Sequence, residues 1–239
     1  MQRSYVTLRR TEIIFALLLI SPIALAQPRF PVRQEISDLS AHTTEAPAIH
    51  SMVTQGIMRT VNAAKFEPDA PTTRGELATS VQHMFKLGPP AKPVTFTDIP
   101  PTSSFYSSVE AVAPFLGRQM LCFGCALISN FLPSEPTSRI EATVLLTNIL
   151  VSRQKVSLIS PAEVDSVLGP LTDVNQLRGP VRAYIATAIR NDIVTLAAPN
   201  LLDPYARISR AQTASMLDLV QRKFMIPPVS APVSPASPP

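Results

Sequence analysis

The sequence is poor in the residues from which most catalytic and metal sites are built. Its 239 residues include no tryptophan, two cysteines and three histidines. A zinc site needs four ligands, and His42, His50 and His83 have no spacing that would recruit the two cysteines. The chain also lacks a G-x-S-x-G string, an H-E-x-x-H string and a phosphate-binding glycine loop. We therefore expect a protein that is not an enzyme and uses no cofactor or metal.

Charged residues are also scarce, at 16% of the chain. The formal net charge is +4, but residues 1–26 hold three arginines and one glutamate, so the rest of the chain carries only +2. No cluster of lysines and aromatic residues is present. A nearly neutral chain has no general attraction to nucleic acid, and we expect no nucleic-acid partner.

The N-terminus has the pattern of a secretory signal peptide. Arginines precede an apolar run at residues 13–20, and the string A-L-A at residues 24–26 is a small-residue cleavage site. The apolar run is shorter than the ~20 residues that span a bilayer. We expect residues 1–26 to be removed and the protein to be exported to the periplasm, cell surface or cell wall. No transmembrane span is expected after cleavage.

A short string occurs three times in the remainder of the chain. Each copy has an apolar residue, a proline two positions later and an arginine eight positions later. The copies are Phe66, Pro68 and Arg74; Phe131, Pro133 and Arg139; and Leu202, Pro204 and Arg210. A spacing that stays constant across three copies indicates one structural unit used repeatedly.

Each arginine lies inside a capping-box pattern. A Thr or Ser at the N-cap accepts a hydrogen bond from the N3 amide, and a Glu or Gln at N3 reaches back to the N-cap. The three pairs are Thr73 and Glu76, Ser138 and Glu141, and Ser209 and Gln212. Helices are predicted to open there, with buried stripes that include Val81, Leu146 and Leu217.

The arginines themselves need an explanation beyond capping. A cation at the first helical position meets the positive end of the helix dipole, which disfavours it by up to about 1 kcal/mol. Either Arg74, Arg139 and Arg210 each pair with a carboxylate of their own repeat, or they face an anion that the helix N-terminus also attracts. The sequence leaves both explanations open.

An aspartate followed by an aliphatic residue lies upstream of each capping box, at Asp38, Asp98 and Asp173. A second helical pattern follows each of these aspartates. Apolar residues recur there with i, i+3, i+4 and i+8 spacing, which predicts a helix that buries one face. The matched positions are Ile49, Met52, Val53, Ile57 and Met58; Val112, Phe115, Leu116, Met120 and Leu121; and Ile185, Ala188, Ile189, Ile193 and Val194. We predict an all-α fold of three helix-loop-helix repeats, and Ser160-Pro161 is expected to open a small extra helix.

The ordered set of strings resembles the S-layer homology family, whose repeat carries F-x-D-[LIV], a first helix, an F-x-P loop and a T-R-A-E string that opens the second helix. The resemblance covers three copies, which we call copy one (36–88), copy two (94–153) and copy three (169–225). We expect residues 27–35 to form an N-terminal arm and residues 226–239 a proline-rich, disordered tail. The resemblance implies packing about a pseudo-threefold axis, with grooves where the T-R-A-E arginine meets acidic cell-wall polysaccharide. Arg74, Arg139 and Arg210 match that arginine.

The chain departs from the family pattern in several places. Without tryptophan, the aromatic residue of each first helix is missing, and the glycine that ends that helix is kept only as Gly56. Copy three carries Gln212 in place of glutamate and Asp192 in place of that glycine. We therefore expect copies one and two to provide ligand sites and copy three the weakest site.

The two cysteines, Cys122 and Cys125, lie in the loop of copy two, which is two residues longer than the matching loops. In an exported protein we expect them to form a disulfide, with two unpaired thiols as the alternative. A redox or zinc role lacks the surrounding pattern that it needs.

Two functional classes remain open at this point. The first is a non-catalytic cell-envelope module that binds acidic cell-wall polysaccharide or a peptidoglycan-linked polymer. The second is a periplasmic or surface scaffold for contacts with other envelope proteins, with no glycan ligand.

Overall fold

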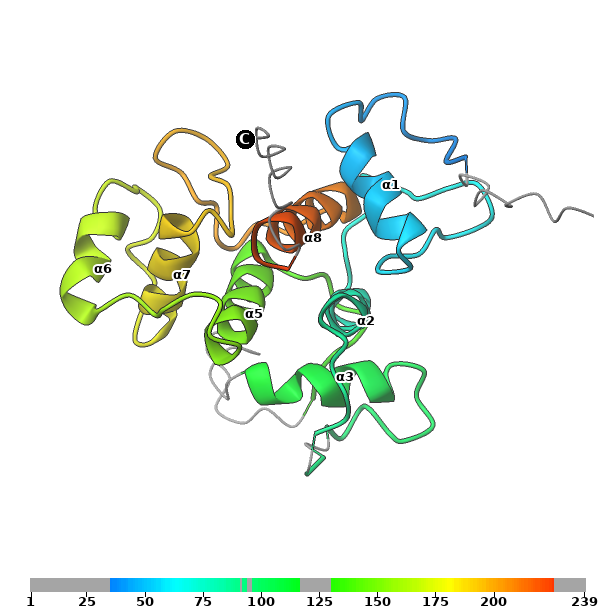
Figure 1. Cartoon of the computed structure of the whole chain (residues 1–239), viewed down its shortest axis with the longest axis horizontal. Coiled ribbons are helices and arrows are strands. Elements are labelled where there is room, and N and C mark those ends of the chain that lie inside the picture. Colours follow the sequence, from blue (N-terminus) through cyan, green and yellow to red (C-terminus); the bar gives the residue numbers. More distant parts are fainter. Residues whose placement is uncertain (1–34, 91, 94–95, 117–129, 226–239) are drawn as a thin grey trace, which may run out of the picture. The chain divides into compact units, whose positions relative to one another are not determined.

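The computed structural model describes residues 35–90, 92–93, 96–116 and 130–225, and these residues are helical without any strand (Figure 1). The all-α prediction is confirmed for them, and the helix expected at Ser160 is α6. The elements are α1 (Ala46–Thr54), α2 (Arg74–Phe85), α3 (Tyr106–Val112), the 3-10 turn η1 (Ala113–Phe115), α5 (Arg139–Ser152), α6 (Pro161–Leu168), α7 (Val181–Arg190) and α8 (Arg210–Phe224). Within the described ranges, no helix combines the length and apolar character that crossing a membrane requires.

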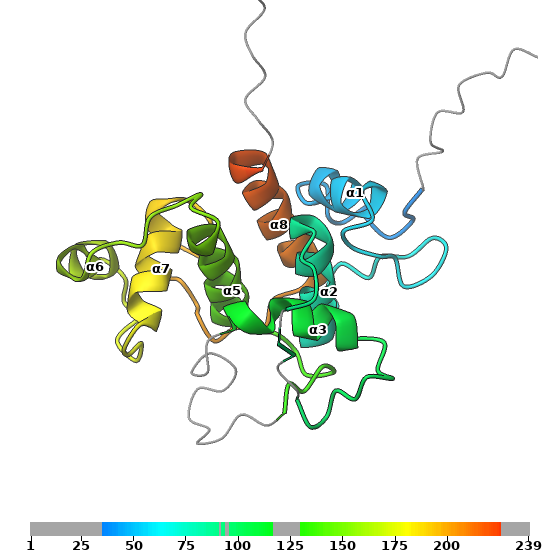
Figure 2. The ribbon, with the colours of Figure 1, turned by 60° about the horizontal axis from the view of Figure 1, so that its bottom comes forward.

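The helices pack between sequence copies rather than within them. The first helix of copy one, α1, packs on α8 of copy three, as both views show (Figures 1 and 2). In the same way, α3 packs on α2, and α7 packs on α5. Each first helix therefore meets the second helix of the preceding copy, and the contact between α1 and α8 joins copy one to copy three.

The predicted stripes form the core of this arrangement. Val81, Leu146 and Leu217 have no exposed surface, which confirms the face that the sequence assigns to the interior. The buried apolar residues of all three copies belong to one cluster. The copies therefore share a core, as stacked or ring-closed repeats do.

A capping box opens each of α2, α5 and α8. In α2 the amide of Glu76 donates to Oγ1 of Thr73 at 3.2 Å, and the amide of Thr73 donates to Oε2 of Glu76 at 2.9 Å. The same two bonds join Ser138 to Glu141 and Ser209 to Gln212. The polar pattern thus fixes where the three helices begin.

The first helices end earlier than the apolar spacing predicts. Helix α1 ends at Thr54, and Gly56 takes a left-handed φ of 68°, so that the amide of Ile57 donates to the carbonyl of Met52 at 2.9 Å. Helix α7 ends the same way, with Asp192 at a φ of 49°. The apolar residues at the i+8 positions are still buried, because this turn folds them back onto the core. Met120 and Leu121 lie outside the described residues.

The recurring aspartates hold the loops that carry the apolar-x-Pro strings. Oδ1 of Asp38 accepts from the amide of Phe66 at 3.0 Å, and its Oδ2 accepts from the amide of Glu67 at 2.8 Å. Asp98 and Asp173 accept the matching pairs of amides in copies two and three. The second amide always belongs to a residue with positive φ: Glu67 at 57°, Leu132 at 59° and Asp203 at 54°. Each carboxylate therefore stabilises a strained turn.

We expect the stability of the protein to fall in acid partly through Asp38. Burial raises the pKa of this carboxyl, but the amides of Phe66 and Glu67 and the charge of Lys65 outweigh burial and lower the pKa below its ordinary value. A lowered pKa gives stability that is present above about pH 4 and is lost as the pH falls through the folded-state pKa. Asp38→Asn should therefore lower the free energy of unfolding by about 1–3 kcal/mol at pH 7. Below about pH 4 the free energy of unfolding of this variant should depend less steeply on pH than that of the parent protein.

Urea denaturation between pH 2 and pH 7 measures this, with Glu35→Gln as a control at an exposed carboxylate. If Asp38→Asn unfolded with the same acid dependence as the parent protein, the assignment of this contribution to Asp38 would be wrong.

Three loop segments close a ring of backbone hydrogen bonds just before the three capped helices. The amide of Thr72 donates to the carbonyl of Ile208 at 2.9 Å, that of Ile208 to Thr137 at 3.0 Å, and that of Thr137 to Thr72 at 2.8 Å. The backbone amides of the three N1 arginines also donate across copies: Arg74 to the carbonyl of Glu135, Arg139 to that of Ala206 and Arg210 to that of Ala70. The N-termini of α2, α5 and α8 are therefore held next to one another.

Candidate functional site

Two of the three N1 arginines bind the capping box of another helix. Arg74 at the start of α2 pairs with Glu141 of α5, and Arg210 at the start of α8 pairs with Glu76 of α2. The partners are the N3 glutamates of a different copy, whereas the sequence argument considered carboxylates within each arginine's own repeat. Asp38, Asp98 and Asp173 bind loop amides instead.

Arg210 bonds to three groups of the surrounding fold. Its side chain donates to Oε1 of Glu76 at 2.6 Å, to the carbonyl of Phe66 at 2.7 Å and to the carbonyl of Arg59 at 2.5 Å. The guanidinium also lies over the ring of Phe66, 4.6 Å from its centroid. Only 5% of Arg210 is exposed, so this cation is built into the fold.

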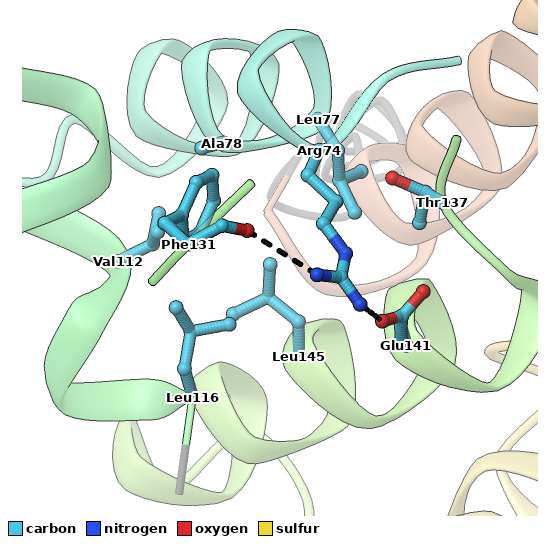
Figure 3. Close-up of a pocket in the computed structure, with 9 residues that line it drawn as sticks. All are labelled: Arg74, Leu77, Ala78, Val112, Leu116, Phe131, Thr137, Glu141 and Leu145. Atoms are coloured by element: carbon cyan, nitrogen blue, oxygen red, sulfur yellow. Dashed lines mark hydrogen bonds and ion pairs between the residues drawn. The ribbon is translucent and has the colours of Figure 1, made fainter. Parts of the chain in front are cut away.

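Arg74 has similar partners, and Figure 3 shows two of them. It donates to Oε1 of Glu141 and, at 3.2 Å, to the carbonyl of Phe131. Apolar side chains from both neighbouring helices, such as Leu77 and Leu145, line the space beside it. The cavity there is only about 30 Å³, so the groove at Arg74 is nearly filled.

Arg139 differs from both in its lack of a charge partner. It is only 9% exposed, yet in the part of the chain that the structure describes its guanidinium has no carboxylate within ion-pair distance. It lines a cavity of about 410 Å³, which we call the Arg139 groove, together with Gln212, Ser215, Leu219, Ile193 and Thr195 among others. By position, Gln212 is the residue that should meet Arg139, as Glu141 meets Arg74.

Each N3 glutamate uses one carboxylate oxygen for the helix cap and the other for an arginine. In Glu76, Oε2 accepts the amide of Thr73 and Oε1 accepts from Arg210. In Glu141, Oε2 accepts the amide of Ser138 and Oε1 accepts from Arg74. The sequence argument explained these glutamates mainly as caps and did not identify an arginine of another copy as the partner of the second oxygen.

A third cavity, of about 610 Å³, lies at Arg210 and is lined by Arg59, Glu76, His83 and Phe105 among others. Each of the three arginines therefore lines a cavity of its own. Over the described ranges, no group of three His, Cys, Asp or Glu side chains could hold a metal ion. Cys122 and Cys125 lie outside the described residues, so the disulfide stays a prediction.

Arg74 itself falls within a segment that matches a known domain. Residues 35–78 match the S-layer homology domain. The matched segment contains Asp38, Phe66, Arg74 and Glu76, which are the loop anchor, the loop aromatic residue, the N1 arginine and the N3 glutamate of copy one. A comparison with curated proteins found no match to the chain.

The S-layer homology domain is a non-catalytic binding module. Its presence at residues 35–78 implies a place in the cell envelope or at the cell surface, an anchoring role and binding to cell-wall polymer. The match does not extend to residues 94–153 or 169–225, for which the family resemblance stays a prediction.

Proposed function

We propose that this protein is a cell-envelope module that binds acidic cell-wall polysaccharide, or a peptidoglycan-linked polymer, through grooves between three S-layer-homology-like copies. The observation that carries the proposal is that Arg74, Arg139 and Arg210 each line a separate cavity. A guanidinium forks onto a carboxylate, and the amides of the helix N-terminus add positive potential. An acidic group on a polymer is the ligand that such a groove attracts.

We further propose that the three copies are arranged about a pseudo-threefold axis. Two cyclic sets of contacts, together with two ion pairs, support this arrangement. The amides of Thr72, Ile208 and Thr137 form a closed ring, and the pairs α1–α8, α3–α2 and α7–α5 follow the same order. The ion pairs of Arg74 and Arg210 also follow this order from one capping box to the next.

A scaffold for protein contacts is the second candidate. The observation that favours it is that Arg74 and Arg210 already have carboxylate partners in Glu141 and Glu76. An arginine neutralised in this way stabilises the fold and offers less to a ligand. On this alternative, the grooves would take no glycan.

Retention on purified cell-wall sacculi separates the two candidates. The protein should be retained on intact sacculi and lost from sacculi whose attached polysaccharide has been removed chemically. The double variant Arg74→Ala, Arg139→Ala should lose retention, because two of the three arginines are gone. The double variant Arg182→Ala, Arg190→Ala removes two partly exposed arginines that pair with Asp165 and Glu163 of α6, so it is the charge-matched control and should be retained normally. Unchanged retention of the double variant, together with a clear fall in melting temperature, would leave the scaffold as the function.

A further inference from the structure

We propose that the Arg139 groove is the site that takes the acidic group, and that Gln212 is the residue that keeps it open; this inference rests on the proposed function. The first step is the difference in charge between the grooves. Glu141 neutralises Arg74 and Glu76 neutralises Arg210, whereas Arg139 has no carboxylate partner within the described ranges. A cation that is about nine-tenths buried without a counterion favours binding of an anion beside it.

The second step is the chemistry of the N3 side chain. Oε1 of Gln212 accepts the amide of Ser209 at 3.0 Å, as the capping box requires. The other terminal atom of Gln212 is an amide nitrogen, which takes the place of the oxygen that Glu76 and Glu141 give to an arginine. A nitrogen that donates cannot accept from Arg139. The single change from carboxylate to amide therefore removes the internal partner of Arg139 and adds a second donor to the groove.

The third step is the loop residue beneath the arginine. Arg210 stacks on Phe66 and donates to its carbonyl, and Arg74 donates to the carbonyl of Phe131. Copy three has Leu202 at this place in the string, and no such bond from Arg139 occurs in the part of the chain that the structure describes. The donors of Arg139 thus stay available for a ligand carboxylate, which a guanidinium can bind with two parallel hydrogen bonds.

The fourth step is the size and lining of the groove. Its volume of about 410 Å³ falls within the range of about 300–1,000 Å³ that is usual for small-molecule sites, unlike the filled groove at Arg74. Ser215 and Thr195 offer hydroxyl groups, and Leu219 offers an apolar wall. One sugar unit with a carboxylate fits this mixture of donors and apolar surface.

Two acidic residues, Glu45 and Asp203, also line the groove. Their charges oppose a ligand of high negative charge density, because like charges brought together at a site cost several kcal/mol. The site therefore favours a single carboxylate on an otherwise neutral sugar over a polyphosphate chain. The sequence argument took Gln212 as a sign that copy three has the weakest site, whereas in this inference Gln212 opens the groove of Arg139, the arginine of copy two.

The test restores the glutamate. Gln212→Glu should supply Arg139 with the ion pair that the other two arginines have, raise the melting temperature, and weaken binding of the probe, glucuronate, more than about tenfold. Binding is followed by nuclear magnetic resonance titration, and retention on sacculi is measured in parallel. Gln221→Glu adds the same charge to α8 outside the groove and should bind as the parent protein does.

The outcomes separate the inference from the proposed function. Loss of glucuronate binding in Gln212→Glu, with normal binding in Gln221→Glu, supports the inference even if the parent protein is not retained on sacculi. Normal sacculus retention of Gln212→Glu and of Arg139→Met, with loss in Arg74→Ala, overturns the inference and keeps the proposed function. Absence of glucuronate binding by the parent protein also overturns the inference.

Discussion

Replacing Arg210 by methionine is expected to lower the free energy of unfolding by about 3–5 kcal/mol. Methionine keeps the apolar stem, so the loss comes from the charged group. The change leaves Glu76 without its cation and takes the donor from the carbonyls of Phe66 and Arg59. A buried polar group that loses its hydrogen-bond partner destabilises the fold by its full desolvation free energy.

Arg139→Met is the matched control, because it makes the same chemical change at the equivalent position of another helix. Arg139 has no ion pair with any described residue to lose, and it is a cation at the positive end of α5. The free energy of unfolding should therefore stay within about 1 kcal/mol of the parent protein or rise. Urea denaturation of both variants measures the difference, and equal losses would contradict the distinction between a bonded and an unbonded arginine.

The sequence predicts local features of this fold well. Capping boxes at Thr73, Ser138 and Ser209 locate the starts of α2, α5 and α8, because the groups that make these boxes lie within four residues of one another. The stripe that includes Leu146 identifies the buried face of a helix for the same reason. Signals of this kind need no knowledge of the rest of the chain.

The ends of the first helices are less predictable. Apolar spacing continues past α1 to Ile57 and past α7 to Ile193, although Gly56 and Asp192 turn the chain with positive φ. A glycine marks such a turn in the sequence, but an aspartate does so only weakly, since it also occupies many other positions. Because Ile193 is buried after the helix has ended, its position in the sequence fits the apolar spacing of a longer helix.

The partners of the arginines could not be predicted from the sequence. Arg210 meets Glu76 across 134 positions of the chain, and Arg74 meets Glu141 across 67. No periodicity within one copy indicates which copy lies beside it. The cyclic order of the helices is needed to interpret Gln212, which stands where the other two copies have a glutamate. This change affects the arginine of the preceding copy, not the arginine of copy three.

Leu146→Ala should have the other large effect, a loss of about 2–5 kcal/mol of unfolding free energy. Leu146 has no exposed surface, and the α5 that carries it packs on both α7 and η1, so the deleted atoms leave a cavity that the surroundings fill only in part. Val61→Ala, at a side chain that is 54% exposed, should change the free energy by less than about 0.5 kcal/mol.

Urea denaturation followed by circular dichroism measures both the size of the Leu146→Ala effect and its cooperativity. Because the buried residues of the three copies form one cluster, the variant should unfold in a single transition at a lower urea concentration, with an unchanged slope. Separate melting of residues 94–153 would show that the copies fold independently, and a loss below about 0.5 kcal/mol would place Leu146 outside the core. A single, shifted transition is expected, since α1 packs on α8 and α3 on α2 across the boundaries between copies.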